Sequence, residues 1–305
     1  MKKVFSIKNL LLLLFLISLI LIFFKFSANL TEVTENIKKI KTNYLALAFF
    51  LTILNYIFRF FRWWFLLKVI GVDYIPFLKN LLIFLSGFLM TLSPGKIGES
   101  IKAIFIYKDY KVSGWRILPV VFMERYADLL SVFFMLVLSG ILLKLKIFYL
   151  GILIFFAGIF MARLIFKLFE KIKKIPEDHY IIDKVFKLKN ILISTFIGLF
   201  SWSFEALGLW VIIKGLREHI GILKSIFAYS SGTLIGAVSF LPGGLGATEI
   251  SLSKILMKYG LKNDISVSAT ILIRATTLWF GVFLGIVAYL ILVLKMEEKN
   301  ESSIS

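Results

Sequence analysis

Apolar runs of about twenty residues, separated by short polar segments, dominate the hydrophobic pattern of this chain. A helix of about 20 apolar residues crosses the hydrocarbon core of a bilayer, so these runs predict membrane-spanning helices. We expect six full spans, at residues 10–24, 44–67, 117–143, 147–168, 191–213 and 265–294. The predicted fold class is therefore all-α, a polytopic membrane protein. Between the first two spans, residues 29–43 predict a short amphipathic helix at the membrane surface.

Two further apolar segments, 77–107 and 222–258, are too short to cross the membrane twice. Each has an apolar arm, a Pro-Gly break and a short second arm, whereas two crossings need about 40 residues plus a turn. We interpret both as re-entrant helical hairpins, which enter the membrane and return to the same side. Non-helical backbone at that depth is tolerated only within protein or beside a wet cavity, because lipid cannot satisfy its N–H and C=O groups.

The two hairpins belong to an internal repeat. Equivalent residues lie 148, 150 and 149 positions apart in the pairs Pro94 and Pro242, Glu99 and Glu249, and Arg125 and Arg274. Repeats of a whole membrane unit are typical of transporter folds. The resulting division is a first span with the surface helix, a first repeat, a linking span with a basic loop, a second repeat and a disordered polar tail, at residues 1–43, 44–146, 147–190, 191–295 and 296–305.

Counting spans predicts that the two repeats are inverted. With the basic N-terminus in the cytoplasm, the first hairpin enters from inside, the Lys-rich loop 170–190 returns to the inside, and the second hairpin enters from outside. Basic loops favour the cytoplasmic side, although the outer connections also carry Lys, so the charge pattern supports this topology in part. We expect a multi-pass protein of the cell membrane with both termini in the cytoplasm.

Composition narrows the class of protein. The 305 residues are 59% hydrophobic, and the formal net charge is +18. The basic residues cluster between apolar runs, where they face water and anionic headgroups, and no soluble module remains to bind nucleic acid. The chain has no Cys, and its two His, His179 and His219, lie in polar connections. We therefore expect no disulfide, no metal site and no other cofactor.

The breaks at Pro94-Gly95 and at Pro242-Gly243-Gly244 are the first candidates for binding chemistry. After each break a half-helix begins at depth, with unpaired N–H groups and the positive end of its dipole exposed. Such an end attracts anions, including phosphate. Two ends that enter from opposite sides could meet near the midplane and form one site.

Glu99 and Glu249 lie in or near the first turn after each break. One interpretation is a carboxylate that pairs with a substrate cation, with an Arg of the opposite span or with a transported proton. The other is a carboxylate that caps and stabilises its own helix N-terminus. The sequence leaves both interpretations open.

Arg125 and Arg274 lie several residues inside predicted spans, where an Arg costs roughly 2.5–3.5 kcal/mol and needs a partner or a wet cavity. Arg also binds phosphate through paired hydrogen bonds. Arg125 has candidate partners on its own helix in Glu124 and Asp128. No acidic residue lies near Arg274 in the sequence, which favours a partner across the fold or a lipid phosphate.

Besides Glu124 and Asp128, three further secondary candidates each have two interpretations. Arg59 and Arg62, beside Trp63, fit interfacial anchoring or headgroup binding. Glu205, isolated within its span, is either a proton-titrating group or a buried carboxyl that stays protonated.

Five motifs in order resemble the flippase-like domain family, which includes the transmembrane region of lysylphosphatidylglycerol synthase. They are Arg59-x-x-Arg62-Trp63, Pro94-Gly95-Lys-x-Gly98-Glu99, Glu124-Arg125-x-x-Asp128, Pro242-Gly243-Gly244-x-Gly246-x-x-Glu249 and Arg274, and the resemblance covers about residues 8–295. It implies translocation of a lipid with a phosphate-containing headgroup, with Glu99, Arg125, Glu249 and Arg274 along the lipid path. The soluble aminoacyl-transferase domain is not part of this sequence, so synthase activity is not implied.

We therefore expect a flippase or translocase for an anionic or phosphate-containing membrane lipid, and not an enzyme. One alternative is a transporter of a small soluble anion. The other is a membrane-embedded transferase that acts on a lipid headgroup, which would need an acidic metal cluster or a positioned base. The lipid species, the energy source, the direction of movement and the oligomeric state leave no trace in the sequence.

Overall fold

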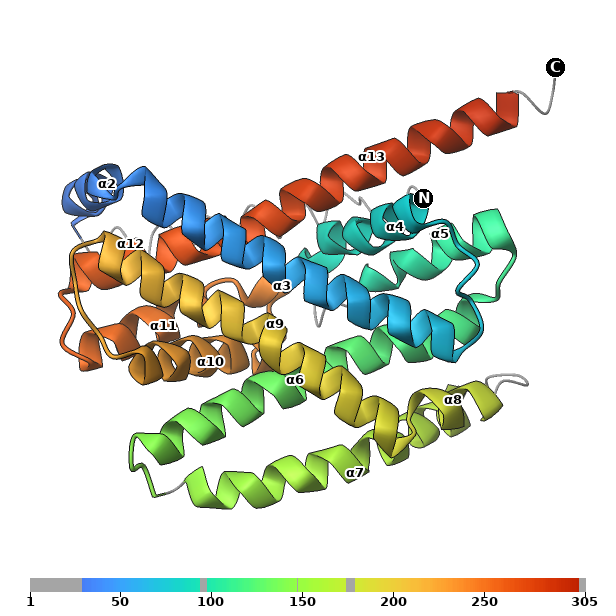
Figure 1. The fold of residues 1–305 in the computed structure, drawn as a ribbon, viewed down its shortest axis with the longest axis horizontal. Helices are drawn as coiled ribbons and strands as arrows, with labels where there is room; N and C mark the ends of the chain where they lie inside the picture. Colours follow the sequence, from blue (N-terminus) through green and yellow to red (C-terminus); the bar gives the residue numbers. More distant parts are fainter. Residues whose placement is uncertain (1–28, 94–97, 147, 174–178, 302–305) are drawn as a thin grey trace. The chain divides into compact units, whose positions relative to one another are not determined.

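The computed structural model describes residues 29–93, 98–146, 148–173 and 179–301, and every regular element within these ranges is a helix (Figure 1). In chain order they are α2 (Leu30–Lys39), α3 (Thr42–Val69), α4 (Phe77–Leu89), η1 (Met90–Leu92), α5 (Ile101–Tyr110), α6 (Gly114–Leu142), α7 (Phe148–Lys173), α8 (His179–Val185), α9 (Leu188–Gly215), α10 (Ile222–Val238), η3 (Pro242–Gly244), α11 (Ala247–Lys258), α12 (Asn263–Arg274), η4 (Ala275–Trp279) and α13 (Phe280–Glu301). The predicted all-α class is confirmed. The predicted first span, 10–24, lies outside the described residues.

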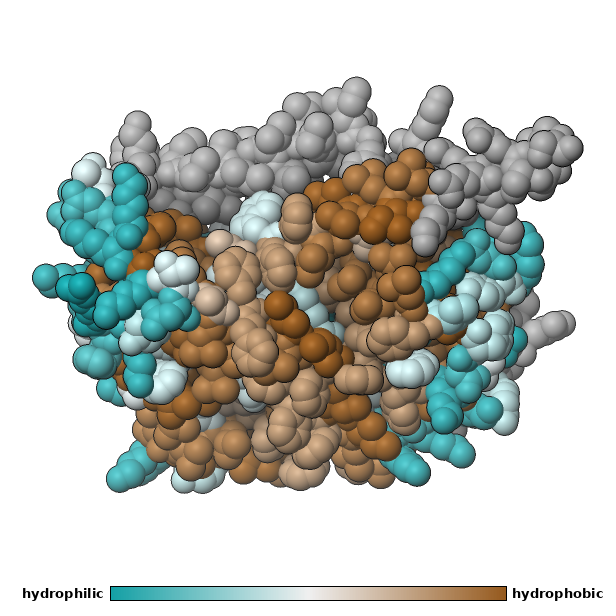
Figure 2. All heavy atoms as spheres, turned by 45° about the horizontal axis from the view of Figure 1, so that its top comes forward, coloured by the Kyte–Doolittle hydropathy of each residue, from teal (hydrophilic) through white to brown (hydrophobic). Residues whose placement is uncertain are grey.

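Four helical segments of the described part are long and apolar enough to cross a membrane: α3, α6, α9 and the continuous run Asn263–Leu294. They correspond to the second, third, fifth and sixth predicted spans. The segment Phe148–Met161 of α7 counts among the shorter apolar helices, together with Phe77–Leu92 and Ile222–Val238, so six full spans stays a prediction. On the face drawn in Figure 2, hydrophobic side chains cover much of the surface, as expected of helices that contact lipid.

Both predicted hairpins have a helix–break–helix form. In the first, the 13-residue α4 and the short turn η1 precede the 10-residue α5. In the second, the 17-residue α10 and the turn η3 precede the 12-residue α11. Each of these helices is shorter than the roughly 20 residues that a full crossing needs. Entry into the membrane and return to the same side stays a prediction.

Packing divides the chain into two units, each assembled from segments that are distant in the sequence. Among the described residues, unit 1 comprises 29–52, 92–93 and 204–278, and unit 2 comprises 53–91, 98–146, 148–173, 179–203 and 279–301. The second hairpin therefore belongs to unit 1, and most of the first hairpin belongs to unit 2. The five-segment division expected from the sequence stays a prediction.

In unit 2 the main core lies around α3, α4 and α6, and α4 packs along α13. Gly285 on α13 allows this packing, because a Cβ there would overlap the backbone of Leu89 on α4. Trp63 on α3 is fully buried, and its Nε1 donates to Asn80 Oδ1 on α4 at 2.8 Å. The first arm of the hairpin is thus fixed against two long helices.

In unit 1 the two arms of the second hairpin, α10 and α11, pack closely together. A Cβ on Gly236 of α10 would collide with the side chain of Thr248 on α11, so glycine sets their separation. The predicted amphipathic helix is present as α2, and its Val33 packs against Val267 of α12. The backbone N–H of Asn29 donates to Asp264 Oδ1 at 2.8 Å, which fastens the start of α2 to the start of α12.

Of the tail 296–305 expected to be disordered, the part up to Glu301 continues α13, and residues 302–305 lie outside the described residues. Extending an existing helix is far less costly than starting one, and Glu and Lys in this segment are good helix formers. The π-helical turn Ala275–Trp279 joins α12 to α13, so that the last predicted span is one continuous run interrupted directly after Arg274. Such π turns are frequent at functional sites.

Candidate functional site

The repeated Glu and Arg residues form the same ion pair in both repeats. In unit 2, Arg125 Nη1 on α6 donates to Glu99 Oε1 at 3.0 Å. In unit 1, Arg274 Nε at the end of α12 donates to Glu249 Oε1 on α11 at 2.5 Å. A carboxylate that follows the hairpin break therefore pairs with the Arg of the next long helix in each case. The 149-residue spacing in the sequence corresponds to repeated three-dimensional chemistry.

The pair in unit 1 is built on a backbone that only glycine adopts easily. Gly243 and Gly244 have φ values of 61° and 67°, and Gly246 has 84°, which lie in the left-handed region disfavoured for residues with a Cβ. This conformation ends the approach from α10 and turns the chain into α11. The Arg274 guanidinium holds the turn, because its Nη2 donates to the Gly243 carbonyl at 2.7 Å.

Glu249 caps its own helix and also pairs with an Arg, whereas a substrate cation or a transported proton as its partner stays a prediction. Its Oε2 accepts from the backbone N–H of Gly246 at 2.6 Å, the geometry of a carboxylate that caps its own helix. Its Oε1 simultaneously accepts from Arg274. The expectation that Arg274 lacks an acidic partner nearby in sequence was correct, and its partner comes from the preceding hairpin.

The pair in unit 2 belongs to a larger group of buried ionised side chains, which we call the charge cluster. Its members are Arg59, Arg62, Glu99, Lys102, Glu124, Arg125 and Asp128. They come from α3, from the second arm of the hairpin with the residues just before it, and from α6. The hairpin is thereby linked to two long helices of unit 2 through charge as well as through apolar packing.

Asp128 is the centre of the charge cluster. Its Oδ1 accepts from Arg62 Nη2 at 2.5 Å and from Trp202 Nε1 at 3.0 Å. Its Oδ2 lies 3.1 Å from Arg125 Nη2 and 3.8 Å from Arg59 Nη2. Of the two partners expected for Arg125 on its own helix, Asp128 is the one it contacts. Its other partner, Glu99, comes from the hairpin.

Glu124 has a different partner, Lys102, which sequence reasoning did not single out. Lys102 Nζ lies 2.5 Å from Glu124 Oε2 and 4.0 Å from Glu99 Oε2, and 4.3 Å from the centroid of the Trp63 ring. Lys102 is only 1% exposed. Its position three residues after Glu99, the spacing of neighbours on a helical face, is the feature of the sequence that could have identified it.

Arg59 and Arg62 are not interfacial anchors, so that interpretation is wrong. They are 6% and 0% exposed, and Trp63 is also fully buried, whereas Trp64 is the exposed member of the motif. Helical periodicity explains the difference, since Arg62 and Trp63 lie three and four residues after Arg59 and share its covered face, whereas Trp64 lies one position further around the helix. The face of α3 that carries both Arg points into unit 2.

The charge cluster contains four cations and three carboxylates, and therefore one excess positive charge. Arg59 Nε, Arg62 Nε and Nη1, and Arg125 Nε have no hydrogen-bond acceptor among the described residues. A buried donor without an acceptor costs about 1–3 kcal/mol, and more when it is charged. The charge cluster therefore combines excess positive charge with spare guanidinium donors, both of which an anion would offset.

Space beside Arg62 depends on Gly198 of α9. A Cβ at this position would lie 2.9 Å from Arg62 Nη1 and would overlap the hydroxyl of Ser131, which donates to the carbonyls of Ala127 and Thr195. The glycine therefore makes room for the guanidinium against the helix.

The secondary candidate Glu205 lies in unit 1 on α9, 5% exposed. The hydroxyl of Tyr229 on α10 donates to its Oε2. A second contact joins the same helices, from Ser225 Oγ to the carbonyl of Ala206 at 3.2 Å. The Glu205–Tyr229 contact therefore links α9 to the first arm of the second hairpin.

The structure describes the predicted break of the second hairpin but not that of the first. Pro94 and Gly95 fall in the segment 94–97, which the structure does not describe. Pro242, Gly243 and Gly244 form the turn η3 and are buried, as expected of a break inside the protein. Within the described ranges, the structure contains no group of three His, Asp or Glu side chains that could hold a metal ion.

Comparison with known proteins adds independent information. Residues 10–285 match the family described as the lysylphosphatidylglycerol synthase TM region. A UPF0104 membrane protein of Methanocaldococcus jannaschii is 24% identical over 301 residues, which cover 86% of this chain and 89% of the relative. A UPF0104 membrane protein of Pyrococcus horikoshii is 24% identical over 258 residues, 71% of this chain and 76% of the relative.

Proposed function

Since this chain belongs to the family of the lysylphosphatidylglycerol synthase transmembrane region, we propose that it translocates a membrane lipid with an anionic, phosphate-containing headgroup. The observation that carries the proposal is the charge cluster, with its excess positive charge and its guanidinium donors that lack acceptors within the part of the chain that the structure describes. A phosphate group supplies several acceptor oxygens and a negative charge, and Arg binds it through paired hydrogen bonds.

The repeated Glu–Arg pair supports movement of a lipid in preference to permanent binding. In each unit the Arg is held by a carboxylate of the neighbouring hairpin. A headgroup phosphate can replace that carboxylate as the partner of the Arg, and it leaves again when the carboxylate returns. Such an exchange avoids the cost of an uncompensated Arg at either stage.

A transport assay in liposomes tests the proposal. Purified protein is reconstituted with a trace of headgroup-labelled phosphatidylglycerol, and the labelled lipid that reaches a membrane-impermeant quencher is followed over time. Arg274→Ala and Glu249→Ala should slow movement at least tenfold, since a charge-assisted hydrogen bond is worth about 1.5–3 kcal/mol. Lys254→Ala, which removes an exposed cation from the same helix as Glu249, should behave as wild type.

The same preparation distinguishes the alternatives. Uptake of free phosphate without any protein-dependent movement of an anionic lipid would replace the proposal by a transporter of small anions. Chemical modification of the labelled headgroup, detected by mass spectrometry of the extracted lipid, would indicate a transferase. Unchanged lipid movement in both variants would remove the Glu–Arg pair from the mechanism.

Inverted orientation of the repeats is part of the proposal and has its own test. Lys111, after the first hairpin, and Lys262, after the second, are both exposed in the structure. The variants Lys111→Cys and Lys262→Cys therefore each place a single thiol at an accessible position. Labelling of intact cells with an impermeant thiol reagent should reach the second position and not the first. Labelling of both positions from one side would contradict the inversion.

A further inference from the structure

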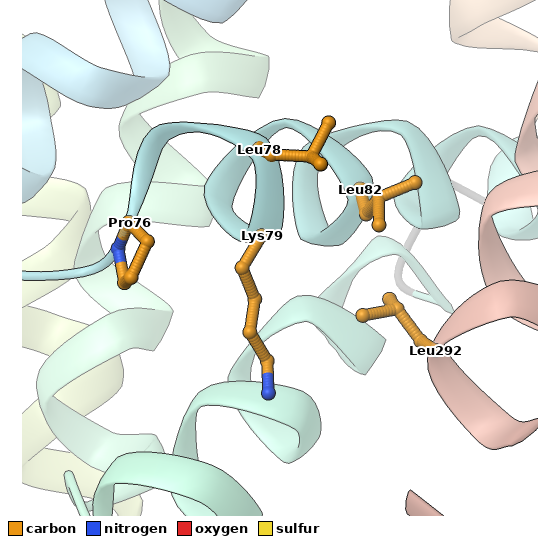
Figure 3. A pocket seen from close by; sticks show the side chains of 5 residues that line it. All are labelled: Pro76, Leu78, Lys79, Leu82 and Leu292. Atoms are coloured by element: carbon orange, nitrogen blue, oxygen red, sulfur yellow. The ribbon is translucent and has the colours of Figure 1, made fainter. Parts of the chain in front are cut away.

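A second feature of unit 2 lies away from the charge cluster. An open groove of about 230 Å³ lies between the N-terminal part of α4 and α13, lined by Pro76, Leu78, Lys79, Leu82 and Leu292 (Figure 3). Leu82 and Leu292 lie at one end, and the Lys79 side chain extends from α4 at a distance from them. This volume is below the usual range of small-molecule sites, about 300–1,000 Å³, so the groove can hold only part of a ligand.

The cationic residue of this groove, Lys79, is held in an ion pair. Lys79 Nζ lies 2.6 Å from Asp109 Oδ2 at the end of α5, and 5.8 Å from the centroid of the Tyr110 ring. The Lys79 side chain is nevertheless 36% exposed. An ammonium group has three donors, so Asp109 does not use all of them. Lys79 can therefore bind an additional acceptor without losing its partner.

The side chains around the groove are of the types that gather where lipid headgroups lie. The Tyr74 and Tyr110 rings are in edge contact, with centroids 5.8 Å apart. Phe77 and Leu78, at the first turn of α4, are 55% and 61% exposed. Tyr and Lys next to exposed apolar side chains are typical of the boundary between hydrocarbon and water. The groove therefore combines apolar lining residues with one basic side chain, just as a phospholipid combines apolar chains with a charged headgroup.

We propose that this groove holds one apolar chain of an anionic phospholipid, whose phosphate contacts Lys79. Four of the five lining residues are apolar, which favours a hydrocarbon chain over a soluble anion. Beside Asp109, the exposed Lys108 and Lys111 add positive charge, which favours an anionic over a zwitterionic headgroup. The site is separate from the charge cluster and does not depend on the transport activity proposed above.

Two variants test the chain and the headgroup separately. Leu82→Trp fills the groove and leaves the Lys79–Asp109 pair intact, and Leu138→Trp, on an exposed position of α6, is its control. Lys79→Gln removes the headgroup contact, and Lys79→Arg should restore it. Lys39→Gln, which breaks the exposed Lys39–Glu35 pair at 3.0 Å, controls for the loss of a surface ion pair.

The measurement is native mass spectrometry of the full chain in detergent, titrated with phosphatidylglycerol, phosphatidylcholine or glycerol phosphate. Wild type should retain phosphatidylglycerol in preference to phosphatidylcholine. Leu82→Trp should lose one bound lipid, and Lys79→Gln should weaken phosphatidylglycerol about fivefold, the factor for one basic residue at an anionic surface. Equal retention by Leu82→Trp and Leu138→Trp would overturn the site. Equal competition by glycerol phosphate would show an anion site without a chain and would also overturn it.

Discussion

Replacing Asp128 by Asn is the sharpest test of the charge cluster. The carboxylate accepts from Arg62 at 2.5 Å and from Trp202 at 3.0 Å, and it faces Arg125 at 3.1 Å. Asn keeps the size of the side chain and one acceptor oxygen but removes the charge, which raises the excess in the cluster from one positive charge to two. Removing one partner of a buried ion pair costs about 3–5 kcal/mol, because the other charge is left uncompensated.

That loss is large compared with the total stability of a protein. At about 2–4 °C per kcal/mol, Asp128→Asn should lower the apparent Tm by about 6–20 °C. The assay is thermal unfolding of the purified protein in detergent, followed by intrinsic Trp fluorescence and by the monodisperse fraction after heating. Asp73→Asn, at an exposed position before α4, is the matched control and should stay within about 0.5 kcal/mol of wild type.

A second substitution separates charge balance from local packing. Arg62→Gln combined with Asp128→Asn returns the cluster to its original excess charge. The double variant should therefore be more stable than Asp128→Asn alone, by about 1 kcal/mol or more. The reasoning fails if Asp128→Asn unfolds at the wild-type temperature, or if adding Arg62→Gln lowers the Tm further.

Three other predictions concern single contacts. Gly198→Ala should destabilise unit 2 by about 1–3 kcal/mol, since its methyl overlaps the Ser131 hydroxyl; unchanged thermal unfolding would contradict this. Trp202→Phe should lower stability by about 1.5–3 kcal/mol, because it removes the indole donor to the central carboxylate of the cluster. The variant should still express as folded protein, and complete failure to fold would contradict this prediction. Hydrogen bonding with Asp264 and its negative charge raise the pKa of Glu32 above its ordinary value, while Lys262 opposes the shift. The protonated form therefore favours the folded state, and apparent stability should fall as pH rises through the interval between the ordinary pKa and the raised one. Glu32→Gln should flatten that pH profile in thermal unfolding, and an unaltered profile would refute the link.

The break and the repeat could be predicted from the sequence because neither requires knowledge of which segments pack together. Segment lengths that are too short for two crossings, together with Pro-Gly, predict a broken hairpin without knowledge of its neighbours. The spacing of Glu99 and Glu249 from their Arg partners indicates a shared arrangement, and the structure confirms an ion pair in each repeat. The sequence did not show that the partner would be this particular Arg.

Burial of Arg59 and Arg62 could not be predicted in the same way. Arg beside Trp at the end of a span is the usual pattern of an interfacial anchor, and local sequence alone favours that interpretation. Only the packing of α3 against other parts of unit 2 shows that this face is covered. The role of Lys102 was hidden for the same reason, since its partner Glu124 lies on a different helix.

Hydropathy and spacing thus determined on their own that the chain is an α-helical membrane protein with a repeated, broken hairpin. These properties depend on helix length, on the hydrogen-bonding demand of buried backbone and on the conformations that Pro and Gly allow. Tertiary structure decided which charges meet, how many remain in excess and which Arg side chains are buried. Those outcomes depend on contacts between residues tens of positions apart, and no local pattern records them.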